Sequence, residues 1–411
     1  MNSFVEHNVL DAPVADAAAH PSPLLTKVQA LVPGFKSSAR DVEAAGQVPD
    51  THMEALRDIG YFDLLKPRAF GGAEQNFDVL VEANLVLAQG CASTAWVGGL
   101  LAAHQWLLAG FPEAAQQDVW GQNPDALMCG SYAPVAKASA EKGGYRLSGS
   151  WSFSSGCENA QWAFCAAMVP ALAGGDALEP AFLLVPAADY RIDETWDVIG
   201  LGGTGSKSLL LDNVFVPAHR ILTFAQTTSG NTPGALLYVA NPTFRIPMLT
   251  TIPSCLASVA VGAAAGALED YLRATGSRVT RGAVAGAHQK MAEFPTIQLR
   301  IAEAAASVDA AQEILLRDLR AVTAQTVSGE PVTIEDRITS RRGQAFAVSL
   351  ALRAVEALNA STGGLGLNMS NPVQRAWRDV NAVSRHISMN WDAVGTMYGQ
   401  MALGLPPRGQ Y

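Results

Sequence analysis

The chain has 411 residues, of which 49% are hydrophobic and 16% are charged, and its formal net charge is −9 at pH 7. A chain of this length and apolar content can bury a large core in more than one domain. The acidic balance excludes nucleic acid as a partner, because phosphates require a basic face. The five cysteines are odd in number and form no C-x-x-C pair, which indicates a reducing cytoplasm without a disulfide framework or a zinc site.

The first third of the sequence has a helical pattern after a short tail. Residues 1–21 lack the basic start and apolar core of a signal peptide. Their composition, rich in Ala, Asp and Pro, predicts a flexible tail. Residues 22–125 predict a helical domain with helices over Val79–Ala88 and Thr94–Leu108. The stretch Thr51–Glu54 matches the capping-box pattern that begins a helix.

The helix predicted over Thr94–Leu108 is nearly all apolar and is therefore expected to be buried on most sides. It contains His104, whose ring can change its charge near neutral pH. A lone histidine in such a helix is more often a hydrogen-bonded core residue than a catalyst, and the pattern alone leaves both possibilities open.

Residues 126–232 predict a β domain, because short runs rich in β-branched and aromatic residues alternate there with Gly and Pro. A turn is expected at Gly174-Gly175-Asp176. The strands are expected at Trp162–Val169, Ala181–Val185, Tyr190–Ile192 and Ser208–Val216.

The segment Gly200–Gly205 matches G-x-G-x-x-G, but a dinucleotide site would need a helix directly after it. The following residues, Lys207–Asp212, have the pattern of a strand instead. We therefore expect a turn between strands, which can still offer backbone amides to a ligand. The Ser154-Ser155-Gly156 triplet is a weak signal that turn chemistry also explains.

Residues 233–411 predict a helical bundle. The apolar run Ile252–Leu268 falls short of the ~20 residues that cross a membrane, so a buried helix is expected. Thr333 and Asp336 form a second capping-box pattern. Long helices are expected over Met248–Thr275, Gln289–Val327, Asp336–Ser361 and Pro372–Met401.

The last of these helices carries an apolar stripe with a polar stripe beside it. Asp379, His386 and Asn390 lie at i, i+7 and i+11, which places them along one face if the helix is continuous. Such a face either lines a pocket or forms a solvated edge, and the spacing does not decide between the two.

Two segments, Gly144–Gly156 and Gly202–Pro217, together with the order of helical, β and helical modules, resemble the acyl-CoA dehydrogenase fold from about residue 24 onward. The resemblance implies an α+β multidomain chain with an N-terminal α domain, a middle β-barrel-like domain and a C-terminal four-helix bundle. The sequence departs from the dehydrogenases at Met128–Pro134, where their T-E-P-x-A-G-S-D segment has no counterpart. It also lacks their Y-E-G-T-like glutamate motif. The C-terminal residues Arg375–His386 look instead like the two-component flavin-dependent monooxygenases of this fold, the group that includes phenol, p-hydroxyphenylacetate and polyketide hydroxylases.

This resemblance implies a set of site residues. His386 matches the active-site histidine of the group, and Ser155, or its neighbour Ser154, matches the serine beside flavin N5. His104 and Ser131 match pocket residues of the phenol hydroxylases. The resemblance also implies cofactor contacts from Trp151 and Thr204, with Arg245 as a weaker candidate for a flavin or substrate contact.

The resemblance further implies an oxygenase component that receives reduced flavin, FMNH2 or FADH2, from a separate reductase. Oxygen would add at flavin C4a and pass to a small, aromatic or phenolic substrate, with His386 as a base or as a stabiliser of the transferred oxygen. Alternatives are an FAD-dependent acyl-CoA dehydrogenase or oxidase, an N- or S-oxygenase, and a non-catalytic helical assembly protein. A cytoplasmic homotetramer without a metal is expected, with close helix contacts around Gly262–Gly266.

Overall fold

The computed structural model describes residues 23–170, 177–279 and 289–411, so the predicted tail and the turn at Gly174-Gly175-Asp176 lie outside the described residues. The α-helices are α1 Pro23–Ala45, α2 Asp50–Asp58, α3 Phe77–Ala88, α4 Ala92–Ala109, α5 Glu113–Val119, α6 Phe224–Ser229, α7 Pro233–Leu237, α8 Ile252–Gly276, α9 Pro295–Val327, α10 Ile334–Asn359, α11 Pro372–Ser384 and α12 Trp391–Ala402. The strands are β1 Met128–Lys137, β2 Ser139–Glu141, β3 Gly144–Ser154, β4 Trp162–Pro170, β5 Leu178–Pro186, β6 Arg191–Asp193, β7 Lys207–Pro217 and β8 Ile221–Thr223.

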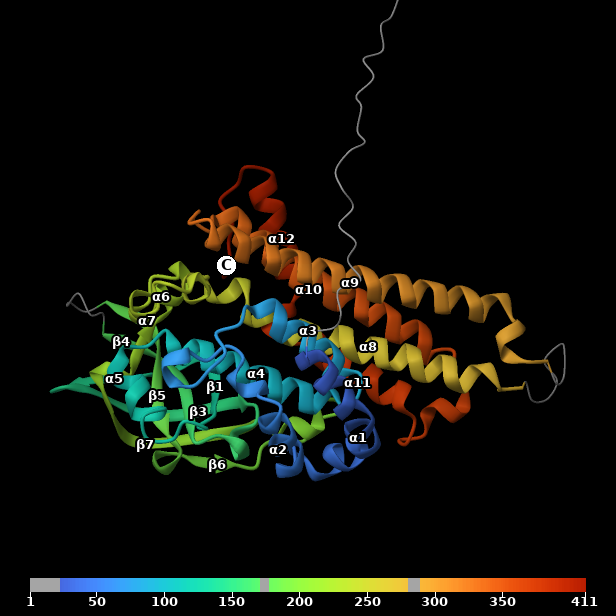
Figure 1. Ribbon diagram of the computed structural model, residues 1–411, viewed down its shortest axis with the longest axis horizontal. Helices are drawn as coiled ribbons and strands as arrows, with labels where there is room; N and C mark the ends of the chain where they lie inside the picture. The colour runs from blue at the N-terminus through green and yellow to red at the C-terminus, as the bar shows by residue number, and fades with distance from the viewer. Residues whose placement is uncertain (1–22, 171–176, 280–288) are drawn as a thin grey trace, which may run out of the picture.

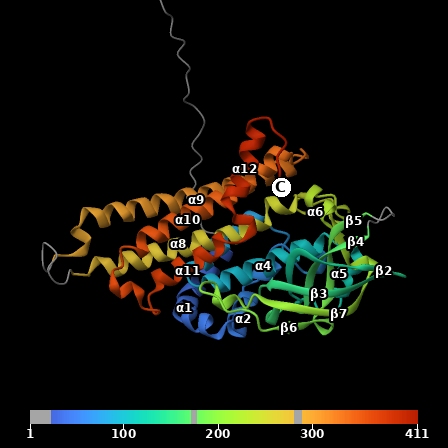
Figure 2. The ribbon, with the colours of Figure 1, turned by 180° about the vertical axis from the view of Figure 1, so that it is seen from behind.

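The strands form two four-stranded sheets, ordered β1-β4-β5-β8 and β2-β3-β7-β6. No closed barrel forms among the described strands, so the barrel-like expectation is wrong. The Trp151 indole N–H of β3 donates to the Ala166 carbonyl of β4 at 2.7 Å and joins the two sheets through their common core. The sheets occupy one end of the molecule, and the long helices α8 to α11 extend to the other end (Figures 1 and 2).

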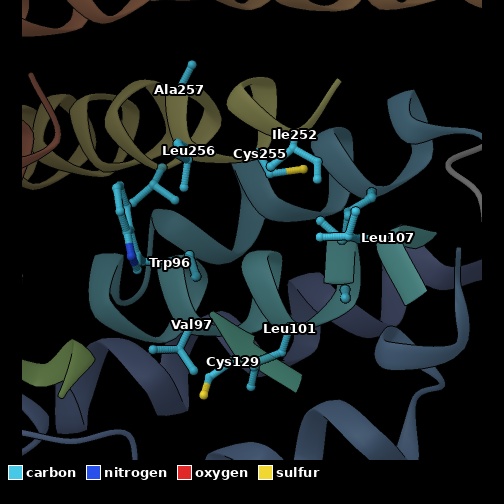
Figure 3. Close-up of a cluster of buried hydrophobic side chains, with 14 of the residues drawn as sticks. Trp96, Val97, Leu101, Leu107, Cys129, Ile252, Cys255, Leu256 and Ala257 are labelled. Atoms are coloured by element: carbon cyan, nitrogen blue, oxygen red, sulfur yellow. The ribbon is translucent and has the colours of Figure 1, made fainter. Parts of the chain in front are cut away.

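Helix α4 lies between the sheets and the C-terminal helices. Almost every residue of α4 is buried, as its apolar composition predicts. Figure 3 shows Trp96 beside Leu256 of α8, whereas Val97 and Leu101 lie near Cys129 of β1. The position of α4 therefore couples the helical bundle to the β module.

Helix α8 extends beyond the apolar run Ile252–Leu268, and with the preceding residues it is long and apolar enough to cross a membrane by composition alone. However, 89% of its most apolar window is buried inside the protein, as in the core helix of a folded domain. Its Gly262–Gly266 run is used within the chain: a Cβ at Gly262 would lie 2.7 Å from the Ala88 Cβ of α3. The small residues thus serve the α3–α8 contact, and they give no support to a contact between subunits.

The two predicted capping boxes have different outcomes. Helix α2 begins at Asp50 with Pro49 as its N-cap and no side-chain cap, so the Thr51 capping box is wrong. The Thr333 capping box at the start of α10 is confirmed: the Thr333 hydroxyl accepts from the Asp336 amide at 3.2 Å.

The helix predicted over Pro372–Met401 is broken. It ends at Ser384, and α12 starts at Trp391 after a 3-10 turn, η11, over Ile387–Met389. His386 has extended backbone angles, and its ring caps η11, while the Asn390 side chain accepts from the Ala393 amide at 3.1 Å. Polar side chains that bond the nearby backbone compete with a continuous helix. Asp379, His386 and Asn390 therefore do not share one helix face.

Candidate active site

The end of β3 meets the turn before β7, because these two strands pair antiparallel with Ser154 opposite Lys207. The turn contains a 3-10 segment, η5, over Gly202–Thr204, and strand β7 follows it, so the predicted turn between strands is confirmed in place of the strand–turn–helix of a Rossmann motif. The Gly156 amide donates to the Thr204 carbonyl at 3.1 Å and fastens the two segments together.

Three buried hydroxyls lie in a row at this junction. The Ser155 and Ser206 Oγ atoms are 2.7 Å apart, and Ser206 Oγ is 2.7 Å from Thr204 Oγ1. The Thr204 hydroxyl donates to the Leu201 carbonyl at 2.9 Å. Ser206 lies within one of the two segments that carry the resemblance, but its place in this row depends on the fold of the turn and could not be predicted.

Trp96 connects this row to the C-terminal helices. Its indole N–H donates to Ser155 Oγ at 2.9 Å, and its ring contacts the His386 ring edge to face with centroids 5.8 Å apart. Sequence reasoning missed Trp96; the available signal was an indole N–H in a nearly all-apolar helix, which must find an acceptor when it is buried. The structure therefore brings Ser155, Thr204 and His386 into one neighbourhood through Trp96 and Ser206.

His386 is half-buried in the connection between α11 and α12. Burial, and then the positive charge of Arg341, lowers the pKa of His386 to about 4, so its ring is neutral at pH 7. The Ser388 amide donates to His386 Nδ1 at 3.2 Å. Because an amide can only donate, Nδ1 carries no proton and the neutral ring holds its proton on Nε2. His386 thus offers an N–H donor rather than the free lone pair of a base.

In His104 on α4, the donor and acceptor nitrogens are exchanged relative to those of His386. Burial lowers its pKa to about 4, and the hydrogen bond to Met128 opposes this shift. Nδ1 lies 2.5 Å from the Met128 carbonyl, which can only accept, so Nδ1 carries the proton. Nε2 is then an acceptor, and it is buried without a partner among the described residues. Aromatic rings surround it: the ring centroids of Phe164 and Tyr132 are 5.4 and 5.7 Å from that of His104.

The remaining predicted residues lie outside this arrangement. Trp151 is 0% exposed with its N–H occupied, and Ser154 is 0% exposed and donates to the Trp151 carbonyl at 3.2 Å. Both side chains stabilise the β3 end from inside, and the cofactor contacts expected of Trp151 and Ser154 stay predictions. Ser131 is buried on β1 opposite Cys165, three residues beyond Met128. Arg245 is exposed on the 3-10 turn η7, Pro242–Arg245.

Helix α11 holds the turn that carries Thr204. The Leu201 amide donates to Asp379 Oδ1 at 2.7 Å, and Arg378 donates to the Ile199 carbonyl at 2.7 Å. Arg378 also pairs with Glu43 of α1. Asp379 further lines a pocket between α1, α8 and α11, and none of the predicted site residues lines that pocket. Asp379 is therefore an anchor for the turn, and not part of a polar face with His386.

Replacing Asp379 by asparagine is expected to change how stability depends on pH. Burial raises the pKa of Asp379 to about 6, and Leu201 and Arg378 partly oppose that shift. The folded protein thus retains a proton that the unfolded chain has lost, and the resulting stability is complete below about pH 4 and is lost as pH rises through 6. The asparagine side chain can still accept from the Leu201 amide but cannot ionise. The free energy of unfolding of Asp379→Asn, relative to wild type, should rise by up to about 3 kcal/mol between pH 4 and 7.

Denaturant titrations of both proteins at several pH values check this expectation. A difference between the two proteins that stays constant from pH 4 to pH 7 would show that Asp379 does not titrate in this window.

Comparisons with known proteins agree with this architecture. Residues 254–391 match the family model "Acyl-CoA dehydrogenase, C-terminal domain". The chain is 63% identical over 392 residues to the FADH(2)-dependent resorcinol hydroxylase, oxygenase component, of Rhizobium sp. (strain MTP-10005), covering 94% of this chain and 96% of that protein. The 3-HSA hydroxylase of Rhodococcus sp. RHA1 has a similar structure, with a TM-score of 0.88, 35% identity, and coverage of 94% of this chain and 98% of that chain. XiaF from Streptomyces sp., solved in complex with FADH2 and glycerol, has a TM-score of 0.84 at 27% identity, and the match covers 94% of this chain and 96% of that chain.

Proposed function

Because this chain belongs to the family of flavin-dependent monooxygenase oxygenase components with the acyl-CoA dehydrogenase fold, we propose that it hydroxylates a small phenolic ring. Reduced flavin from a separate reductase and O2 are its co-substrates. A dihydroxybenzene such as resorcinol is the first candidate substrate, and the relative that carries this proposal is the 63% identical hydroxylase. The acyl-CoA dehydrogenase alternative fits less well, since the close relatives are named as hydroxylases or monooxygenases.

The residues at the end of β3 fit a flavin ring. Ser155 Oγ keeps one lone pair beyond its bonds to Trp96 and Ser206. Two residues earlier, Phe153 is 71% exposed and has a left-handed backbone with φ 64°, a conformation that costs free energy for a non-glycine residue. The Ser155 amide donates to the Phe153 carbonyl at 3.1 Å, which keeps the two residues close along the chain. An exposed aromatic ring can pack against a planar conjugated ring, and a hydroxyl oxygen can accept from its edge. We therefore assign Ser155, with Phe153 beside it, to cofactor binding.

When reduced flavin is bound, it supplies the chemistry that activates O2, and the protein supplies position, shielding and hydrogen bonds. The unpartnered Nε2 of His104 suits a phenol O–H, because it can accept that proton in a hydrogen bond and so raise the electron density of the ring. The Nε2–H of His386 suits an oxygen atom that gains negative charge during transfer. The two histidines thus have complementary tasks, and Ser131 is proposed as a further contact on the His104 side.

We make further proposals about the domains, the assembly and one surface arginine. The chain divides into an N-terminal helical part (22–125), a β part (126–232) and a C-terminal helical bundle (233–411). It acts in the cytoplasm as a homotetramer, which is the usual assembly of the fold family that it resembles. Arg245, exposed on η7, is proposed as a flavin or substrate contact within that assembly.

The proposed function is tested with the purified chain and a supply of reduced flavin. Anaerobic titration with FADH2 and FMNH2, followed by O2 and a panel of phenols that includes resorcinol, should give hydroxylated product only with reduced flavin. Mass spectrometry identifies the product, and a peroxide assay measures the uncoupled fraction. The proposal is wrong if the protein retains stoichiometric oxidised FAD through purification and turns over acyl-CoA but no phenol.

A further inference from the structure

The hydrogen-bond directions in the row of hydroxyls can be assigned from one fixed end. The Thr204 hydroxyl has a single proton, and it donates this proton to the Leu201 carbonyl at 2.9 Å. Thr204 Oγ1 must therefore accept from Ser206 Oγ across their 2.7 Å contact. Ser206 has then used its own proton, so Ser155 must donate to Ser206 across the next 2.7 Å contact. The protons run in one direction, from Ser155 through Ser206 and Thr204 to the Leu201 carbonyl.

The other side of Ser155 is also fixed. The Trp96 indole N–H can only donate, and it donates to Ser155 Oγ at 2.9 Å. Ser155 therefore has one proton committed to Ser206 and one lone pair committed to Trp96. What remains for a ligand is a second lone pair, so Ser155 can accept a hydrogen bond but has no proton to donate.

We propose that Thr204 and Ser206 are positioning residues that make Ser155 select the redox state of the flavin. This inference rests on the proposed function, which assigns Ser155 to flavin binding, and on the resemblance, which implies that this serine lies beside flavin N5. Reduced flavin carries a proton on N5 and is a donor there, whereas N5 of oxidised flavin is a bare acceptor. A lone pair on Ser155 accepts from the reduced form and faces another lone pair in the oxidised form. The direction of the hydroxyl row thus favours retention of reduced flavin and release of oxidised flavin.

The four side chains that set this polarity are all buried, with exposures of 7% for Trp96 and Ser155, 4% for Ser206 and 1% for Thr204. Water therefore has little access to reverse the donors and acceptors. The backbone end of the row is held as well, because the Leu201 amide is bonded to Asp379 at 2.7 Å. The folded turn, and not the serine alone, therefore determines that Ser155 acts as a hydrogen-bond acceptor toward a ligand.

The test is equilibrium binding to the flavin-free protein, without turnover. Oxidised FAD and dithionite-reduced FAD are each titrated anaerobically, and the ratio of the two dissociation constants is the readout. Ser206→Ala releases the Ser155 proton, which can then turn toward N5 of oxidised flavin. Thr204→Val releases the Ser206 proton, which can then be donated to Ser155 and free the Ser155 proton in turn. Both variants should tighten oxidised FAD by roughly three- to tenfold, the scale of one hydrogen bond, and reduce the preference for reduced FAD.

Two further variants separate polarity from general disruption. Ser155→Ala should weaken the binding of reduced FAD without tightening the binding of oxidised FAD. Ser208→Ala is the matched control, because Ser208 is a neighbouring serine of β7, 4% exposed, whose hydroxyl bonds Ser152 and Thr195 outside the row. The ratio of the two dissociation constants should be the same for Ser208→Ala as for wild type.

The inference is wrong if Ser206→Ala and Thr204→Val leave the ratio of dissociation constants unchanged or weaken both redox forms equally, as loss of a purely structural contact would. In that case wild type still binds reduced FAD and the proposed function stands. If wild type binds neither redox form, the proposed function fails and this inference fails with it.

Discussion

Replacement of His386 by alanine is expected to lower the rate of hydroxylation by roughly 10²–10³-fold, the usual effect of removing a preorganised donor to a developing negative charge. The reason lies in the polarity of the ring: Nδ1 accepts from the Ser388 amide, so Nε2–H is the group left to act on an oxygen. Binding of reduced flavin should change little, because the Trp96 ring lies between Ser155 and His386. Single-turnover rates with a phenolic substrate, and separate binding titrations, measure the two quantities.

Two companion variants distinguish a donor from a base. His386→Asn retains an N–H donor but no group that takes up a proton near neutral pH, so it should recover part of the lost rate if His386 donates and none of it if His386 is the base. His219→Ala is the control, since His219 lies on the turn after β7 and bonds Asp118 of α5, and its replacement should leave hydroxylation unchanged. Wild-type rates and coupling in both His386 variants would assign His386 a structural role only.

The two histidines also have a common effect on stability. Both His104 and His386 have a pKa of about 4, chiefly because burial disfavours the charged ring. The unfolded chain binds these protons near pH 6.5 whereas the folded protein does not, so stability should be lost as pH falls from about 6.5 to 4. This direction is opposite to that of Asp379, whose raised pKa stabilises the folded state in the acidic part of the same range. The two contributions can be separated by comparing Asp379→Asn with wild type.

The sequence predicted the elements with strong periodicity. Strands β4, β5 and β7 and helices α3, α4, α8 and α10 occur where alternation or helical spacing was clear, with boundaries shifted by a few residues. The break between α11 and α12 was not predictable from spacing, because the apolar stripe continues through it. After α11 ends at Ser384, the His386 side chain caps η11 and the Asn390 side chain caps α12, and these local bonds depend on side-chain rotamers.

For the site, the sequence identified the two segments that meet but not the direction in which their side chains point. A register irregularity between Trp151 and Ser154 in the β3–β7 pairing turns Ser154 inward and leaves Phe153 exposed, and residue spacing cannot reveal such an irregularity. Trp96 was missed because it lies 59 residues from Ser155 in a helix that reads as pure core. The tautomers of His104 and His386 depend on tertiary partners, a carbonyl in one case and an amide in the other.

The close approach of α8 to α3 makes Gly262 a second position of large expected effect. A Cβ there would lie 2.7 Å from the Ala88 Cβ and still closer to the Leu85 carbonyl, and neither atom can move without shifting α3. Overpacking a core typically costs about 1–3 kcal/mol, occasionally more, and alanine regains only about 1 kcal/mol through its helix propensity. Gly262→Ala should therefore lower the free energy of unfolding, and Gly262→Val should lower it further because valine adds two methyl groups.

The matched control lies on the same helix. A Cβ at Gly276, the last residue of α8, meets no atom within 4 Å, so Gly276→Ala gains helix propensity without a steric cost and should leave stability unchanged or slightly raised. Thermal and denaturant unfolding of the three variants measure the difference. Because α4 packs against both α3 and α8, a shifted α3 should also displace Trp96 from Ser155. Gly262→Ala is then expected to weaken binding of reduced FAD while Gly276→Ala does not, and equal stability of the two alanine variants would show that the α3–α8 contact can relax without cost.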